Sequence, residues 1–204
     1  MSKYGNKALI VTGGGSVKGS GVFNRAVASL KDAGIAVVEC AGVEPNPRIT
    51  SLHCGIQIAR DESCYVVVAL GGGSTTDAAK VMAAGVFYDG DPWELMAYHE
   101  NAPISTRALP IITVPTLAAT GSEMNSGAVI SDDETSLKPF VMAECLYPCV
   151  ALVDPELTLT VPKDQTAYGV RDLITPRHHQ NTSHRRESER SRRQADCRGV
   201  AGLE

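Results

Sequence analysis

The chain has 204 residues, 43% of them apolar, which is enough to bury the core of one domain, or of two only if both are small. The formal net charge of −4 is unevenly spread: residues 177–204 carry seven Arg and four acidic side chains, so this segment is +3 and the rest of the chain −7. An acidic body gives no reason to expect a nucleic acid partner, and no apolar run approaches the roughly 18 residues that a membrane span needs.

The N-terminal residues 1–7 lead directly into a short apolar run. They contain neither the apolar stretch nor the small-residue cleavage site of an export signal. The six cysteines are scattered, mostly among apolar neighbours, which fits reduced thiols better than a disulfide framework. We therefore expect a cytoplasmic protein.

Apolar runs then alternate with helical patterns. The expected strands are residues 7–12, 35–40, 64–70, 111–115 and 150–155. The expected helices are residues 21–33, which Gly34 ends, 49–60 and the segment after the glycines at 71–73. A small hairpin is expected from residues 128–131 and 140–142, and Pro162 opens a further helix toward Asp172. Apolar strands alternating with amphipathic helices predict an α/β fold with a doubly wound, mostly parallel sheet and helices on both faces.

Two glycine runs follow expected strands, at residues 13–15 and 71–73. A glycine run before a helix lets backbone N–H groups approach a phosphate, and the helix dipole favours its negative charge. We expect Ser74 or Thr75 to cap the helix that follows the second run. Two such loops at one sheet edge suggest a bound dinucleotide, although a turn needed only for packing is the alternative. Neither loop spells G-x-G-x-x-G, which disfavours an ordinary Rossmann dehydrogenase.

Three segments resemble one family when they are taken in order. They read GGGSTTDAAK at 71–80, PTLAATGSEMN at 115–125 and LVDPELTLTVPKDQTAYGVRDLI at 152–174. They are similar to the iron-containing (group III) alcohol dehydrogenases, whose N-terminal domain is dehydroquinate synthase-like. The segments VTGGGSVKGSGV, AGVEPNP and DPWELM are most similar to the NADP-dependent butanol or aldehyde-reducing branch. The resemblance covers residues 7–175.

The resemblance implies a set of cofactor-binding residues. The second glycine loop would hold the pyrophosphate, Asp77 would lie near the nicotinamide, and Lys138 would reach the ribose or the nicotinamide from the hairpin. Residues 116–120 would line the nucleotide cleft. The whole set is Gly13, Gly14, Ser16, Asn46, Gly72, Gly73, Ser74, Asp77, Thr116, Leu117, Thr120 and Lys138.

The same resemblance bears on the choice between NADP and NAD. Relatives that prefer NAD place an acidic residue against the ribose 2′-hydroxyl at the position of Gly13. Gly13 and Gly14 leave room for a 2′-phosphate, and Ser16 and Lys18 can donate to it. We therefore expect NADP rather than NAD.

In this family an Asp and three His hold a divalent metal, Fe or Zn, and the Asp and first His lie at i and i+4 on one helix. Asp172 matches the Asp, but the i+4 residue is Pro176, which has no metal-binding atom and breaks a helix. We expect residues 1–162 to be the nucleotide-binding domain and 163–175 the start of the metal-binding helical domain. We expect the rest of that helical domain to be missing.

Residues 176–204 have no large apolar side chain before Val200, which predicts disorder. The preferred interpretation is arbitrary sequence after a shifted reading frame or an artificial boundary. An Arg/Ser tail that binds RNA or an acidic partner is an alternative. A substitute metal site matches no usual ligand spacing; its candidates are His178, His179, His184 and Cys197.

The resemblance implies hydride transfer between the nicotinamide and a small primary alcohol or aldehyde, next to the divalent metal. This chain would supply the cofactor half and be inactive alone. Two alternatives are glycerol dehydrogenase-type chemistry on the same scaffold and a noncatalytic nucleotide-binding or interaction protein. We also expect a homo-oligomer, because half an enzyme leaves apolar surface exposed.

Overall fold

The computed structural model describes residues 4–96, 106–118, 120–132 and 137–171. The chain divides into two compact units, residues 1–161 and 162–204. In the described part of the second unit, residues 163–171 are helical, as Pro162 at the helix start predicts. The expected disorder of residues 176–204 lies outside the described residues.

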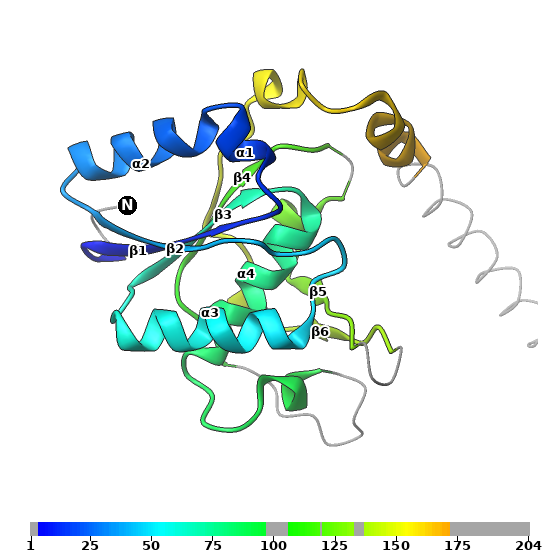
Figure 1. Ribbon diagram of the computed structural model, residues 1–204. Coiled ribbons are helices and arrows are strands. Elements are labelled where there is room, and N and C mark those ends of the chain that lie inside the picture. Colours follow the sequence, from blue (N-terminus) through cyan, green and yellow to red (C-terminus); the bar gives the residue numbers. More distant parts are fainter. Residues whose placement is uncertain (1–3, 97–105, 119, 133–136, 172–204) are drawn as a thin grey trace, which may run out of the picture. The chain divides into compact units, whose positions relative to one another are not determined.

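The first unit is built on a parallel sheet (Figure 1). Its strands are β1 (Lys7–Thr12), β2 (Ala36–Cys40), β3 (Val66–Gly71), β4 (Ile111–Pro115) and β7 (Val150–Ala151). Their order in the sheet is β2-β1-β3-β4-β7, and all four neighbouring pairs are parallel. From β1 the chain passes to the edge strand β2 on one side and then returns to the other side of β1 as β3. The winding direction therefore reverses between β1 and β3. This confirms the doubly wound parallel sheet.

Helices cover both faces of this sheet (Figure 1). On one face lie α1 (Ser16–Gly19) and α2 (Val22–Asp32), whose Val17 and Leu30 pack on Ile10 and Val68. On the other lie α3 (Ile49–Asp61) and α4 (Gly73–Gly85). Residues in successive positions of β1 therefore supply both cores, because strand side chains alternate between faces.

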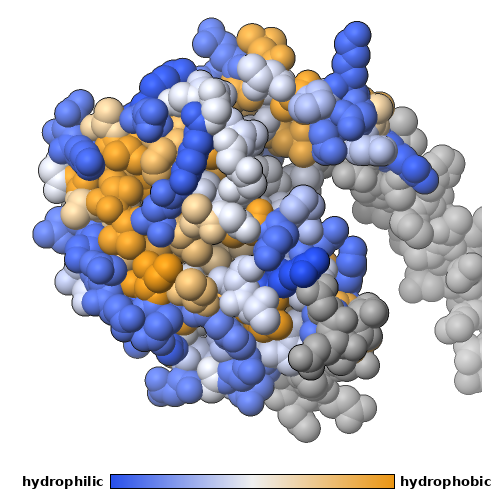
Figure 2. Space-filling view, viewed as in Figure 1, coloured by the Kyte–Doolittle hydropathy of each residue, from blue (hydrophilic) through white to orange (hydrophobic). Residues whose placement is uncertain are grey.

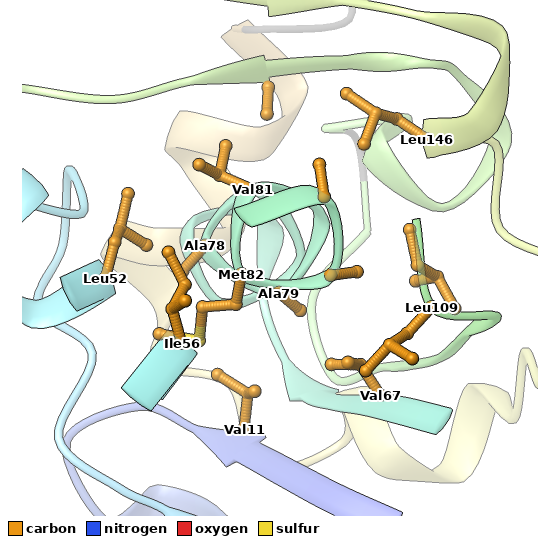
Figure 3. Close-up of a cluster of buried hydrophobic side chains, with 14 of the residues drawn as sticks. Val11, Leu52, Ile56, Val67, Ala78, Ala79, Val81, Met82, Leu109 and Leu146 are labelled. Atoms are coloured by element: carbon orange, nitrogen blue, oxygen red, sulfur yellow. The ribbon is translucent and has the colours of Figure 1, made fainter. Parts of the chain in front are cut away.

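The helix α4 is surrounded by apolar side chains (Figure 3). Figure 3 shows Leu52 and Ile56 of α3 on one side of it, Val67 of β3 below and Leu146 on the opposite side. Ala78, Ala79, Ala83 and Ala84 are fully or almost fully buried. Small side chains at these positions let neighbouring elements approach closely, which fixes α4 in the centre of the unit.

A two-stranded antiparallel ribbon lies beside α4. Its strands are β5 (Gly127–Val129) and β6 (Phe140–Met142), so the expected hairpin forms. Short 3₁₀ segments connect these elements in the described part of the unit: η2 (Pro92–Leu95), η3 (Ser122–Met124), η4 (Glu144–Leu146) and η5 (Pro155–Thr158). The expected fifth strand at 150–155 is wrong in its length, because β7 ends at Ala151 and Asp154 then caps η5 through the N–H of Glu156.

Apolar side chains remain partly exposed at the edge strand β2, where Val37 and Val38 are half-buried. Figure 2 shows hydrophobic side chains gathered between the two helical layers on the face that it views. An unpaired sheet edge is a surface on which another chain can pair. The expected homo-oligomer stays a prediction. None of the described helices is long and apolar enough to cross a lipid bilayer.

Candidate nucleotide-binding site

Three loops meet where β1, β3 and β4 end. Thr12 is level with Leu70 across the sheet, and Gly71 is level with Pro115. Because the strands are parallel, the segments that follow them emerge at the same sheet edge: residues 13–15, 72–74 and 116–118. This edge also holds the point between β1 and β3 at which the winding reverses, the usual ligand position in open α/β sheets.

Packing accounts for two of the three glycines at 71–73, where β3 ends and α4 begins. A Cβ at Gly71 would lie 2.6 Å from Thr75 Oγ1, and a Cβ at Gly73 would lie 2.7 Å from Thr120 Cγ2. A Cβ at Gly72 would have Leu117 Cβ as its nearest atom, at an ordinary 3.7 Å. The chain itself therefore does not require glycine at position 72. Gly72 therefore has room for a methyl-sized group beside its backbone, with Leu117 in ordinary contact.

The N-terminus of α4 has no side-chain cap. Gly72 is its N-cap residue, in extended backbone, and no side chain accepts a hydrogen bond there. The expected cap by Ser74 or Thr75 is wrong, because both residues already lie inside the first helical turn. The first N–H groups of an α-helix have no acceptor within the helix, so the first turn of α4 offers donors beside Gly72.

Ser74 is part of a hydrogen-bonded chain that joins three loops. Its Oγ accepts from the backbone N–H of Asn46 at 3.2 Å, and Asn46 Oδ1 accepts from Lys138 Nζ at 3.0 Å. Asn46 has φ +58°, a left-handed conformation that Asn tolerates better than most residues. The structure thus brings Asn46, Ser74 and Lys138 together from segments far apart in the sequence.

The first glycine loop lies beside the second. A Cβ at Gly13 would lie 3.3 Å from Thr75 Oγ1, whereas Gly14 has nothing within 4 Å of its position. Ser16 is exposed. Lys18, expected to donate to a 2′-phosphate, instead contacts Glu39, with 2.7 Å between Nζ and Oε1. The sequence reading did not single out Glu39.

Asp77 points back into the protein from α4. Its Oδ2 accepts from the N–H of Val129 at 3.1 Å, while the buried Oδ1 has no hydrogen-bond partner among the described residues. Burial raises the pKa of Asp77, and the hydrogen bond from Val129, the Ser122 side chain and the charge of Lys80 oppose that rise. Asp77 therefore ties α4 to β5, and one carboxylate oxygen is left to accept a further donor.

Lys80 was missed by the sequence reading and is completely buried. Its Nζ donates to Asn125 O at 2.7 Å, Asn125 Oδ1 at 2.9 Å and Gly127 O at 2.8 Å. Burial lowers its pKa to about 8, opposed by the charges of Asp77 and Glu123. The ammonium group holds the segment before β5 against α4. That segment begins just after Thr120, so Lys80 supports one wall of the site.

Metal binding was assigned to Asp172, which lies outside the described residues. Across residues 4–96, 106–118, 120–132 and 137–171, no group of three or more His, Cys, Asp or Glu side chains could hold a metal ion. His53, in α3, lies 2.9 Å from the Asp91 carboxylate at the surface. The described residues therefore contain no such cluster of metal ligands.

Comparison with known proteins matches residues 1–155 to the family of iron-containing alcohol dehydrogenases. NADH-dependent butanol dehydrogenase A of Clostridium acetobutylicum is 48% identical over 175 residues, which are 86% of this chain and 44% of that protein. NADPH-dependent aldehyde reductase YqhD of Escherichia coli is 39% identical, over 82% of this chain and 43% of that protein.

Solved structures agree with these matches. The structure of NADH-dependent butanol dehydrogenase A from Thermotoga maritima has a TM-score of 0.80 and 43% identity, covering 83% of this chain and 42% of that one. The chain thus spans less than half the length of these relatives. Two of them are named for NADH and one for NADPH, so the expected preference for NADP stays a prediction.

Proposed function

The chain belongs to the iron-containing alcohol dehydrogenase family, and we propose that its first unit binds the nicotinamide dinucleotide of a metal-dependent alcohol dehydrogenase or aldehyde reductase. The observation that carries this proposal is the room beside Gly72, where an added Cβ would meet only Leu117 at 3.7 Å, next to the uncapped first turn of α4. Three consecutive glycines are explained in this way, because Gly71 and Gly73 serve packing and Gly72 admits the pyrophosphate.

The residues around Gly72 fit a dinucleotide in charge and polarity. Lys138 supplies a positive charge, and its Nζ donates to Asn46 Oδ1 at 3.0 Å. The hydroxyl of Ser74 accepts from Asn46 and keeps its own proton for a phosphate oxygen. We propose that Thr116, Leu117 and Thr120 form the wall opposite these polar groups, since Leu117 and Thr120 already lie next to Gly72 and Gly73.

For the reaction, the bound nucleotide supplies or accepts a hydride at the nicotinamide C4, and the substrate is a small alcohol or aldehyde. We propose that Asp172 is the one metal ligand this chain provides, because Pro176 stands where the family places the next ligand. With one ligand the chain would hold a divalent metal weakly. We therefore expect negligible alcohol-dependent reduction of NADP by the 204-residue chain alone.

The nucleotide can carry a 2′-phosphate in this proposal. The position at which NAD-preferring relatives place an acidic residue is Gly13, and the space beside Gly14 is open. Ser16 is exposed and can donate to a phosphate oxygen. The open space and the exposed hydroxyl favour NADP at the first glycine loop. Lys18 and Glu39, which contact each other, also lie near this loop.

Calorimetric titration of the full chain with NADPH and with NADH tests the proposal. We expect saturable binding of at least one nucleotide. In Ser74→Ala the affinity should fall about tenfold, the effect of losing one hydrogen bond to a charged group. Ser29→Ala is the matched control, because Ser29 is exposed on α2, on the other face of the sheet. Absence of heat with both nucleotides, from protein that unfolds cooperatively, would refute the proposal.

A further inference from the structure

An ion pair lies where β1 and β2 end. Lys18 Nζ of α1 is 2.7 Å from Glu39 Oε1 of β2. The hydroxyl of Thr12, the last residue of β1, also donates to Glu39 Oε1, at 3.4 Å. Lys18 Nζ lies 5.3 Å from the ring centre of Phe23, so it is held from two sides. Both of these contacts of Glu39 are made by Oε1.

The position of this pair follows from the sheet register. Glu39 is level with Ile10, two residues before Thr12, so its side chain lies on the same face of the sheet as Thr12 and α1. Thr12 is followed directly by Gly13. The carboxylate therefore lies beside the first glycine loop, at the end of the strand next to β1. Its side chain is 29% exposed and that of Lys18 46%, so a ligand can reach both.

The structure assigns Glu39 as a specificity-determining residue that sets the choice between NAD and NADP through its contact with Lys18. The assignment rests on the proposed function. In Rossmann folds, a carboxylate about 20 residues beyond the first glycine turn accepts from the ribose 2′-hydroxyl of NAD. Glu39 occupies such a place, and neither of the two contacts described above uses its Oε2.

The same carboxylate opposes NADP in two ways. A 2′-phosphate at the first glycine loop would lie next to a like charge, which is unfavourable. It would also have to draw Lys18 away from Glu39, because the lysine is already paired at 2.7 Å. The space at Gly13 admits the phosphate, while the pair restrains the lysine that would bind it. Gly13 alone therefore does not decide the preference.

The test compares dissociation constants of NADPH and NADH by calorimetry for the full chain and for Glu39→Gln. Glutamine keeps the size of the side chain and removes the charge that holds Lys18. We expect the NADPH constant to fall and the NADH constant to rise, so that their ratio moves toward NADPH by about tenfold. Lys18→Met should weaken NADPH several-fold and leave NADH nearly unchanged.

Glu62→Gln is the matched control. Glu62 pairs with Lys7 at 3.1 Å, where β1 begins, so the control removes a comparable surface ion pair at the opposite edge of the sheet. Its ratio should stay within twofold of the parent ratio. An unchanged ratio in Glu39→Gln, with both nucleotides bound, would overturn the role of Glu39 and leave the proposed function intact. If the parent chain binds neither nucleotide, the proposed function fails, and this inference fails with it.

Discussion

Replacing Gly72 by Ala separates ligand binding from folding at the second glycine loop. The backbone of Gly72 has φ −85° and ψ −168°, an extended conformation that alanine adopts without strain. Its new Cβ would meet only Leu117, at 3.7 Å and beyond. A glycine-to-alanine change at such a position stabilises the fold by about 0.4–1 kcal/mol, because it restricts the unfolded chain.

The same methyl group would occupy the space that we assign to the pyrophosphate. We expect Gly72→Ala to bind NADPH and NADH at least tenfold more weakly, equivalent to a loss of about 1.4 kcal/mol or more of binding free energy. Urea unfolding would measure stability, and calorimetry would measure affinity on the same preparation. The combination of unchanged or higher stability with lost affinity is the expected result.

Gly73→Ala is the matched comparison one residue along. Its Cβ would lie within 2.7–2.9 Å of three Thr120 side-chain atoms, so overpacking should destabilise the fold by about 1–3 kcal/mol. If Gly72→Ala binds both nucleotides as tightly as the parent chain, no phosphate lies against Gly72. The reasoning about this loop would then be wrong, whatever Gly73→Ala does.

Two further predictions concern stability. Burial lowers the pKa of Lys80 from 10.5 to about 8 in the folded chain. Between these two pH values the unfolded chain binds more protons than the folded chain, so the free energy of unfolding should rise with pH. The gain in unfolding free energy is at most about 3 kcal/mol and should be absent from Lys80→Met, as urea titrations at pH 7 to 10 would show. Lys31→Met, at an exposed lysine, is the control. Equal pH dependence in the parent chain and in Lys80→Met would contradict the prediction. Arg60 of α3 donates to the carbonyls of Gly85, Val86 and Tyr88 at the end of α4. Arg60→Met should therefore lower the free energy of unfolding by about 2 kcal/mol without changing the m-value. Arg25→Met, at an exposed arginine, is the control and should change the free energy of unfolding by nearly zero. A loss below 0.5 kcal/mol would show that these bonds add little.

The sequence predicts the framework well, because local patterns determine it. The runs at 7–12 and 111–115 form strands with the expected bounds, since uninterrupted β-branched and apolar residues have few other ways to be buried. Because these runs determine where the strands end, they also determine which loops meet at the carboxyl ends of the strands. The family resemblance then names the residues of those loops, but whether they bind a nucleotide stays a prediction.

What the sequence reading missed depends on contacts between distant segments. Lys80 bonds to residues 45 and 47 positions away, and an apolar helix pattern gives no sign of a buried charge. Glu39 interrupts the apolar run of β2, but only the register shows that it lies beside Thr12 and Lys18. The expected cap at Ser74 is wrong because α4 already begins at Gly73, and the Ser74 hydroxyl instead accepts from the N–H of Asn46, 28 residues away.

The enclosure of α4 has a consequence for the thermodynamics of nucleotide recognition. A helix that is buried along most of its length, with Lys80 anchoring the neighbouring segment, has little freedom to reorient when a ligand arrives. The donors of its first turn are therefore preorganised, and binding loses little conformational entropy of the backbone at this point. Recognition of the pyrophosphate should then be largely rigid, and any adaptation to different dinucleotides would fall to the side chains around the first glycine loop.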